Sequence, residues 1–211
     1  MPGFRVVGYD ANGTIFNDNT QFVNTANGVL ISFGKPTMEA SALLTGFRQP
    51  SSSIFRKAGI TEEEASHDDL HRVYNELYVK QSRAKPFKGV KSTLKWLKDR
   101  DIKLAIVTAQ KEEIIAPLLA EYDLLNMFDY CNYGVENKAE VLRNLCRHFY
   151  LRYHRQMIYV GDQMDDVRHA RDAGCFSVGF GGGMHTFDML WKEAGCDMYI
   201  REHSSIKTLF R

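Results

Sequence analysis

The sequence is poor in cysteine, in long apolar runs and in excess charge of either sign, and each lack excludes a class of protein. Its four cysteines in 211 residues are widely spaced and form no CxxC pair, which argues against a zinc site and a disulfide-rich scaffold. No run of about 18 apolar residues is present to span a bilayer, and the N-terminus lacks the apolar core of a signal peptide. A formal net charge of +1 gives no electrostatic reason to expect nucleic acid or an anionic membrane as partner. We therefore expect a cytoplasmic protein.

The chain does contain several short apolar runs rich in β-branched and aromatic residues. Such runs are typical of strands buried on both faces of a parallel sheet. The clear ones cover residues 4–9, 103–108, 157–160 and 175–180, and weaker ones cover 130–133 and 197–200. Helical patterns at 90–100, 112–122, 138–150 and 163–173 alternate with them. This alternation predicts an α/β fold, with a doubly wound, Rossmann-like parallel sheet.

Residues 17–85 interrupt the alternation. This stretch shows helical patterns, including a long helix candidate at 62–84, and we find no clear strand in it. It is therefore predicted to be a helical insertion between the first strand and the rest of the sheet.

The first candidate site lies at Asp10, which follows an apolar run and precedes a turn at Gly13 and Thr14. A carboxylate at the tip of a buried strand faces a ligand, and the N–H groups of the turn can surround an anion. The same pattern occurs in strand-to-loop turns without a chemical role, so the motif alone leaves both interpretations open.

A second acidic pair lies downstream, where Asp162 ends an apolar run and Asp166 follows one helical turn later. Two carboxylates at close quarters are unfavourable unless a cation lies between them, and Mg²⁺ is the usual cation beside phosphates. Asp165 is expected only to favour the helix N-terminus. Thr108 ends another strand-like run and Lys138 opens a helix, and their side chains suit the oxygens of a phosphoryl group.

In combination, these residues resemble the four motifs of the haloacid dehalogenase (HAD) superfamily of hydrolases. The matching order is Asp10-x-x-Gly-Thr, Thr108, Lys138 and Gly161-Asp162-x-x-x-Asp166. The resemblance covers nearly the whole chain, and the insertion is similar to the α-helical cap of the phosphoglycolate phosphatase-like branch. It implies a HAD α/β core domain at residues 1–16 and 86–211 and a helical cap domain at 17–85. Movement of the cap is expected to gate the site.

The resemblance also implies a magnesium-dependent phosphatase that acts on a small phosphorylated metabolite. Asp10 would attack phosphorus and form an aspartyl-phosphate, which water then hydrolyses. Mg²⁺ would bind the carboxylates of Asp10 and Asp162 and the backbone carbonyl of Asn12, with Asp166 helping directly or through water.

The same resemblance implies how the substrate is held. Thr108 and Lys138 would bind the phosphoryl oxygens, and Lys138 would also offset the charge of Asp10. Residues 47–60 are similar to the region of the cap that selects the substrate, and we nominate Arg48 for substrate contact.

One position departs from the family pattern, because Asn12 stands where these phosphatases usually carry a second aspartate. That aspartate protonates the leaving group and later activates water, and an amide cannot transfer a proton at neutral pH. General acid–base assistance is worth about 10²–10⁴-fold. We therefore expect impaired activity on alkyl phosphates and less impairment on acyl phosphates or aryl esters.

Three interpretations stay open. The chain is a phosphatase with altered leaving-group demands or a surrogate acid such as His185, or a catalytically weakened HAD fold that binds a phospho-ligand or a partner. The third is a C–halogen or C–P hydrolase of the same superfamily, and the C–P reaction would need a lysine from the cap, such as Lys35, Lys57 or Lys80.

The glycine-rich residues 179–183 lack the context of a dinucleotide loop and are predicted to form a flexible loop at the sheet edge.

Overall fold

The computed structural model describes residues 3–48, 50–81, 83–135 and 137–210. The chain forms two compact units, one made of Met1–Asn17 and Lys85–Arg211 and the other of Asp18–Ala84. Gln49, within the region predicted to select the substrate, lies outside the described residues. None of the helices built from the described residues combines the length and the apolar character that a membrane span requires.

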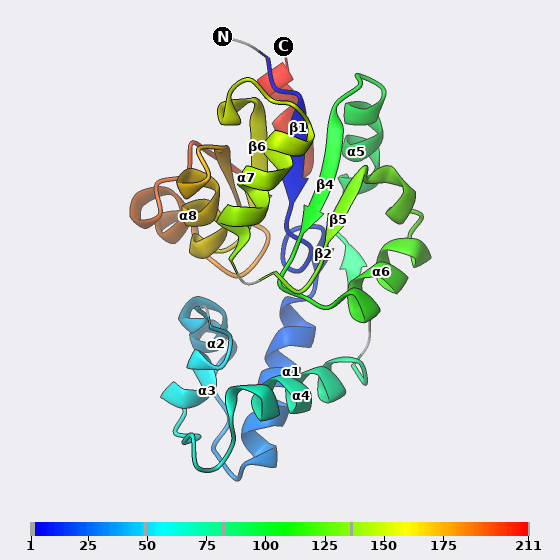
Figure 1. Ribbon diagram of the computed structural model, residues 1–211. Helices are drawn as coiled ribbons and strands as arrows, with labels where there is room; N and C mark the ends of the chain where they lie inside the picture. The colour runs from blue at the N-terminus through cyan, green and yellow to red at the C-terminus, as the bar shows by residue number, and fades with distance from the viewer. Residues whose placement is uncertain (1–2, 49, 82, 136, 211) are drawn as a thin grey trace. The chain divides into compact units, whose positions relative to one another are not determined.

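A six-stranded sheet forms the centre of the first unit, in the order β5-β4-β1-β6-β7-β8. Its pairings are parallel, so the carboxyl ends of the strands lie at one edge (Figure 1). The chain order reverses at β1, with β4 and β5 on one side and β6, β7 and β8 on the other. Doubly wound sheets bind their ligands outside such a switch point. The predicted Rossmann-like α/β fold is confirmed.

The strands coincide with the predicted apolar runs to within one or two residues. Central strands such as β1 are buried along their whole length, which is why they show no polar alternation. The six are β1 (Val6–Tyr9), β4 (Lys103–Val107), β5 (Tyr130–Asn132), β6 (Met157–Gly161), β7 (Phe176–Phe180) and β8 (Met198–Ile200).

Helices cover both faces of this sheet (Figure 1). On one face, α7 (Lys138–His148) and α8 (Met164–Asp172) enclose a core that includes Val6, Ala105 and Tyr159. On the other, α5 (Val90–Lys98) packs against β4 and against the C-terminal 3₁₀ helix η4 (His203–Phe210). The first unit also contains α6 (Glu112–Glu121), two short 3₁₀ helices, η1 (Leu125–Met127) and η2 (His154–Gln156), and the π-helix η3 (Asp188–Glu193). All four helices predicted for this part of the chain are present.

Two very short strands lie where the insertion begins and ends. In the antiparallel pair β2 (Phe16–Asn17) and β3 (Lys85–Pro86), Phe16 is opposite Pro86 and Asn17 is opposite Lys85. Asn17 and Lys85 therefore pair within the first unit, and the expectation of no strand in 17–85 is wrong at both limits. Two-residue strands are too short to leave a period in the sequence.

The second unit is helical, with α1 (Asn19–Ser32), α2 (Ala40–Gly46), α3 (Ser53–Lys57) and α4 (His67–Tyr78). Its core includes Phe22, whose ring centroid lies 5.4 Å from that of Phe47 and 6.4 Å from that of Tyr74. The helix predicted at 62–84 is shorter than expected. It begins after Ser66 because the side chains of Ser66 and Asp69 form a capping box there.

Candidate active site

Three aspartates meet at the carboxyl edge of the six-stranded sheet. Asp10 follows β1, Asp162 follows β6 and Asp166 lies in the first turn of α8. Their exposed fractions are 3%, 0% and 2%, and one carboxylate oxygen of each lies within 4.8 Å of the others. Strands β1 and β6 are neighbours, so the sheet order itself places Asp10 beside Asp162. The helix that follows β6 then brings Asp166 to the same point.

Lys138, the first residue of α7, is buried between two of these carboxylates. Its Nζ donates to Asp10 Oδ1 and to Asp166 Oδ1, over 2.7 Å in each case. Burial raises the pKa of Asp10 to about 6, an effect that Lys138 opposes and Asp166 increases. Burial by itself would lower the pKa of Lys138, but the charges of Asp10 and Asp166 hold it well above its usual value. Lys138 therefore keeps its charge at neutral pH.

The chemistry of this cluster fits a hard divalent cation. Three buried carboxylates and one ammonium leave an excess of negative charge, which is costly in a low-dielectric site unless a cation accompanies it. Mg²⁺ prefers oxygen ligands of this kind, and the three carboxylates come close enough to share one ion.

Both carboxylate oxygens of Asp162 are held in place. Thr14 Oγ1 donates to Oδ1 over 3.0 Å, and the backbone N of Met184 donates to Oδ2 over 2.8 Å. Gly13 and Gly183 allow this close approach, because a Cβ at either position would lie 2.3 or 2.2 Å from Asp162 Oδ2. The sequence pattern assigns no role to Thr14 or Met184, although three consecutive glycines after a strand are a signal for such an approach.

The glycine run at residues 179–183 is a loop only in part, because its first two residues belong to β7 and residues 181–183 form the turn that follows. Strand β7, which contains Gly179, lies between β6 and β8. A Cβ on Gly181 would collide with the Tyr199 hydroxyl at 1.8 Å, and one on Gly182 would lie 2.5 Å from the Phe180 ring. These glycines are required by close packing beside the aspartate cluster.

Thr108 directly follows β4 and is buried. Its Oγ1 accepts from the backbone N of Gln110 over 3.2 Å, and its carbonyl accepts from the backbone N of Val135 over 2.9 Å. The second bond ties the end of β4 to the loop that leads into α7, the helix that Lys138 opens. A hydroxyl that accepts one bond keeps its own proton for donation.

Asn12 and Arg48 are also predicted site residues. Asn12 lies in the turn after Asp10, and Arg48 lies in the second unit. Asn12 is half-buried in the turn after Asp10 and forms an isolated bridge with Phe16. Arg48 belongs to the second unit, where its guanidinium donates to the Thr45 carbonyl over 2.8 Å. The assignment of Arg48 to substrate contact stays a prediction.

His185 is buried beside the cluster but is already engaged. Its Nδ1 accepts from the backbone N of Met164 over 2.8 Å, and its own backbone N donates to the Asp162 carbonyl. Nδ1 is therefore committed as an acceptor, and any proton transfer by this ring would fall to Nε2. Asp165, by contrast, pairs with Arg168 at 3.3 Å in the first turn of α8, as expected of a residue that favours the helix N-terminus.

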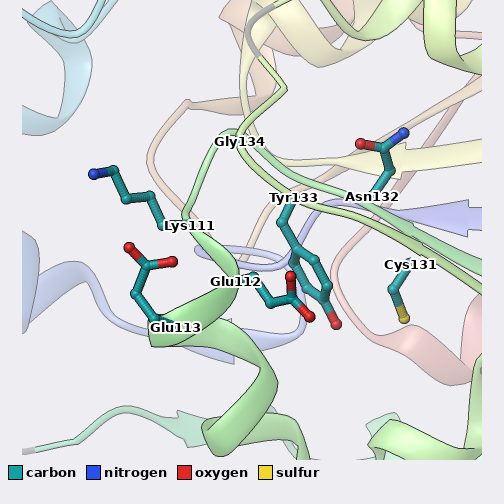
Figure 2. A pocket seen from close by; sticks show the side chains of 7 residues that line it. All are labelled: Lys111, Glu112, Glu113, Cys131, Asn132, Tyr133 and Gly134. Atoms are coloured by element: carbon teal, nitrogen blue, oxygen red, sulfur yellow. The ribbon is translucent and has the colours of Figure 1, made fainter.

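A pocket of about 450 Å³ lies between the start of α6 and the end of β5 (Figure 2). Its lining comes from the start of α6 and from the end of β5 with the turn that follows, and consists of Lys111, Glu112, Glu113, Cys131, Asn132, Tyr133 and Gly134. Figure 2 shows the Glu112 carboxylate beside the Tyr133 hydroxyl. Asp10, Asp162 and Asp166 are not part of this lining, so the acidic cluster and the pocket are separate features of the same sheet edge.

The haloacid dehalogenase-like hydrolase family matches this chain over residues 7–180. The chain belongs to this family. The matched region starts in β1 and ends in β7, so it includes Asp10, Thr108, Lys138 and both downstream aspartates.

Individual relatives agree with this assignment to the HAD-like hydrolases. The chain is 25% identical to a phosphoglycolate phosphatase from Haemophilus influenzae, with 98% of each protein covered. It is 27% identical to a phosphoglycolate phosphatase from Nitrosospira multiformis, with 88% of each covered. Its fold is similar to a solved haloacid dehalogenase-like hydrolase from Streptococcus pneumoniae, with a TM-score of 0.87 at 18% identity over the full length of both chains.

Proposed function

We propose that this HAD-like hydrolase is a magnesium-dependent phosphatase that acts on a small phosphorylated metabolite, with Asp10 as the nucleophile. The observation that carries the proposal is the buried cluster at the switch point of the sheet. There the Asp10 carboxylate lies 2.7 Å from Lys138 Nζ and shares its surroundings with two further carboxylates. The phosphatase names of the curated relatives support the same reaction class.

Each residue of the cluster has a separate task in this proposal. The Asp10 carboxylate attacks phosphorus in line, so that a new O–P bond forms while the bond to the leaving oxygen breaks. Lys138 offsets the charge of Asp10 and, with the Thr108 hydroxyl, holds the oxygens of the transferred group. Water then cleaves the aspartyl-phosphate and releases inorganic phosphate.

Asp10 and Asp162 would hold the metal, together with the backbone carbonyl of Asn12, and Asp166 would contribute directly or through water. A bound Mg²⁺ supplies charge neutralisation at the transferred phosphoryl group. Thr14 and Met184 fix the Asp162 carboxylate for this task through the two bonds described above.

We propose further that the helical unit at Asp18–Ala84 is a cap that controls access to the site. The chain leaves the first unit at β2 and returns at β3, and these two strands pair with each other. Both connections therefore leave the first unit at one place, as a hinged lid requires. Substrate selection by the cap, including a role for Arg48, is part of this proposal.

The substrate follows partly from Asn12. Phosphoglycolate is the first compound to test, because the relatives are named for it. Its leaving group is an alkyl oxygen, however, and Asn12 cannot protonate it. Acyl and aryl phosphates need less help from an acid, so we expect them to be hydrolysed faster than alkyl esters.

Asn12 also favours a second candidate, a catalytically weakened member of the family that binds a phosphorylated ligand or a protein partner. The two candidates differ in turnover. A panel of acyl, aryl and alkyl phosphates is assayed with and without Mg²⁺, beside Asp10→Asn. The phosphatase proposal expects Mg²⁺-dependent turnover of at least one class by the wild type and none by Asp10→Asn. Absence of turnover, with retained binding of inorganic phosphate, would favour the second candidate.

A further inference from the structure

His203 is a buried histidine that lies outside the region matched by the family, which ends at residue 180. It opens the C-terminal helix η4 and is 2% exposed. Its Nε2 lies 2.8 Å from the backbone carbonyl oxygen of Thr14. A carbonyl only accepts, so Nε2 carries the proton and donates it. This hydrogen bond connects helix η4 to the turn that follows Asp10.

The bond reaches the metal-binding carboxylate in one further step. Thr14, whose carbonyl accepts from His203, uses its hydroxyl to donate to Asp162 Oδ1 over 3.0 Å. Thr14 is fully buried, so its peptide group and its side chain have little room to move independently. A shift of the Thr14 peptide would therefore move the hydroxyl that orients Asp162.

The surroundings of His203 keep the ring neutral and fixed. Aromatic rings of Phe180, Tyr9 and Phe87 lie 4.5, 6.1 and 6.4 Å from it, between centroids. Burial lowers the pKa of His203 to about 4, although its bond to the Thr14 carbonyl acts in the opposite direction. At neutral pH the ring thus has one N–H, and that N–H is directed at Thr14.

We propose that His203 is a positioning residue for the metal site, acting through Thr14 on the orientation of the Asp162 carboxylate. The inference rests on the proposed Mg²⁺ site and adds a residue that lies beyond the family match. Residues that orient metal ligands through hydrogen bonds typically change metal affinity by about 10–100-fold when they are removed. Because His203 acts through one intermediate residue, we expect the lower end of that range.

The test compares two substitutions that differ in hydrogen bonding. His203→Phe keeps an aromatic ring in the aromatic surroundings but removes the donor, whereas His203→Gln keeps a donor near the position of Nε2. The Mg²⁺ dissociation constant of each purified protein is measured by isothermal titration calorimetry, without substrate. His203→Phe is expected to bind Mg²⁺ about tenfold more weakly than the wild type, and His203→Gln is expected to restore most of the affinity.

A packing variant in the same helix separates positioning from stability. Ile206 is fully buried in η4, and Ile206→Ala is expected to lower the melting temperature while it leaves Mg²⁺ affinity near the wild-type value. Equal weakening of Mg²⁺ binding by Ile206→Ala and His203→Phe would overturn the proposal, since both would then act through general destabilisation. Wild-type affinity in a folded His203→Phe would also overturn it.

A double-substitution cycle with Thr14→Val tests the path itself. If His203 acts through the Thr14 hydroxyl, Thr14→Val and the double variant bind Mg²⁺ equally weakly, so the effects are not additive. Additive losses would contradict this path. The proposed Mg²⁺ site is tested separately. If that site does not exist, the wild-type protein and Asp162→Asn will give the same titration.

Discussion

Lys138 Nζ lies 2.7 Å from Asp10 Oδ1, and both side chains are buried at the carboxyl edge of the sheet. The pair joins the end of β1 to the start of α7, two points separated by 128 positions in the chain. If Asp10 attacks an anionic phosphoryl group, as proposed, it needs such a cation nearby, because Coulomb repulsion is strong in a buried site. The same cation restrains the Asp166 carboxylate at 2.7 Å.

Replacement of Lys138 by Met should destabilise the metal-free protein. The variant leaves three carboxylates close together without the ammonium, and breaking a buried ion pair in this way costs about 3–5 kcal/mol. Mg²⁺ should raise the melting temperature of Lys138→Met more than that of the wild type, because it binds the folded state and neutralises the excess negative charge of the three buried carboxylates. Thermal unfolding with and without Mg²⁺ at mildly alkaline pH measures both effects. Lys111→Met, at an exposed lysine, is the matched control and should change little.

Replacement of Asn12 by Asp should restore the missing proton donor. On alkyl phosphates the rate is expected to rise by about 10²–10⁴-fold, with a much smaller gain on aryl or acyl phosphates. Initial rates on one substrate of each class measure the ratio. Asn17→Asp, at an exposed position of β2, controls for added charge. A gain of equal size on every class would contradict the leaving-group explanation.

Replacement of Gly183 by Ala should weaken metal binding. The new Cβ would lie 2.2 Å from Asp162 Oδ2, so the carboxylate has to move from the position that Thr14 and Met184 define. Mg²⁺ affinity is expected to fall by about 10–100-fold, measured by calorimetry. Gly3→Ala, which meets no atom within 4 Å, should bind as the wild type does. Unchanged affinity in Gly183→Ala would show that this orientation of Asp162 is dispensable.

His203 should make the protein less stable as the pH falls. Burial lowers the pKa of His203 from 6.5 to about 4, so between these values the unfolded chain binds a proton here that the folded chain does not. The free energy of unfolding therefore decreases as pH falls through this window, by about 3 kcal/mol in total. Urea unfolding across the window should show a shallower pH dependence for His203→Gln. Parallel curves for the two proteins would exclude this assignment.

Much of the fold follows from local patterns in the sequence. Central strands such as β1 and β6 are buried on both faces, so they stand out as apolar runs, and the helices between them show their apolar faces. The strands β2 and β3 escape prediction because they contain two residues each. The extent of α4 depends on the side-chain bonds between Ser66 and Asp69, and an apolar period does not reveal them.

The candidate site likewise contains residues that the sequence predicts and residues that it does not. Asp10, Lys138, Asp162 and Asp166 are recognisable because their spacing places them at strand or helix ends, and the structure brings these four together. Thr14 and His203 are linked across 189 positions of the chain, and such a bond depends on tertiary packing alone. Sequence spacing contains no signal for it.

The central claim, that Asp10 is the nucleophile, is tested most directly by covalent capture. Wild-type protein is mixed with Mg²⁺ and an aryl phosphate, quenched with acid during turnover, digested and examined by mass spectrometry for phosphate on the peptide that contains Asp10. Asn12 should slow the hydrolysis of the intermediate, which favours its detection. The account predicts phosphate on Asp10 in the wild type and none in Asp10→Asn. Substrate turnover with an unmodified Asp10 peptide, or turnover by Asp10→Asn, would contradict it.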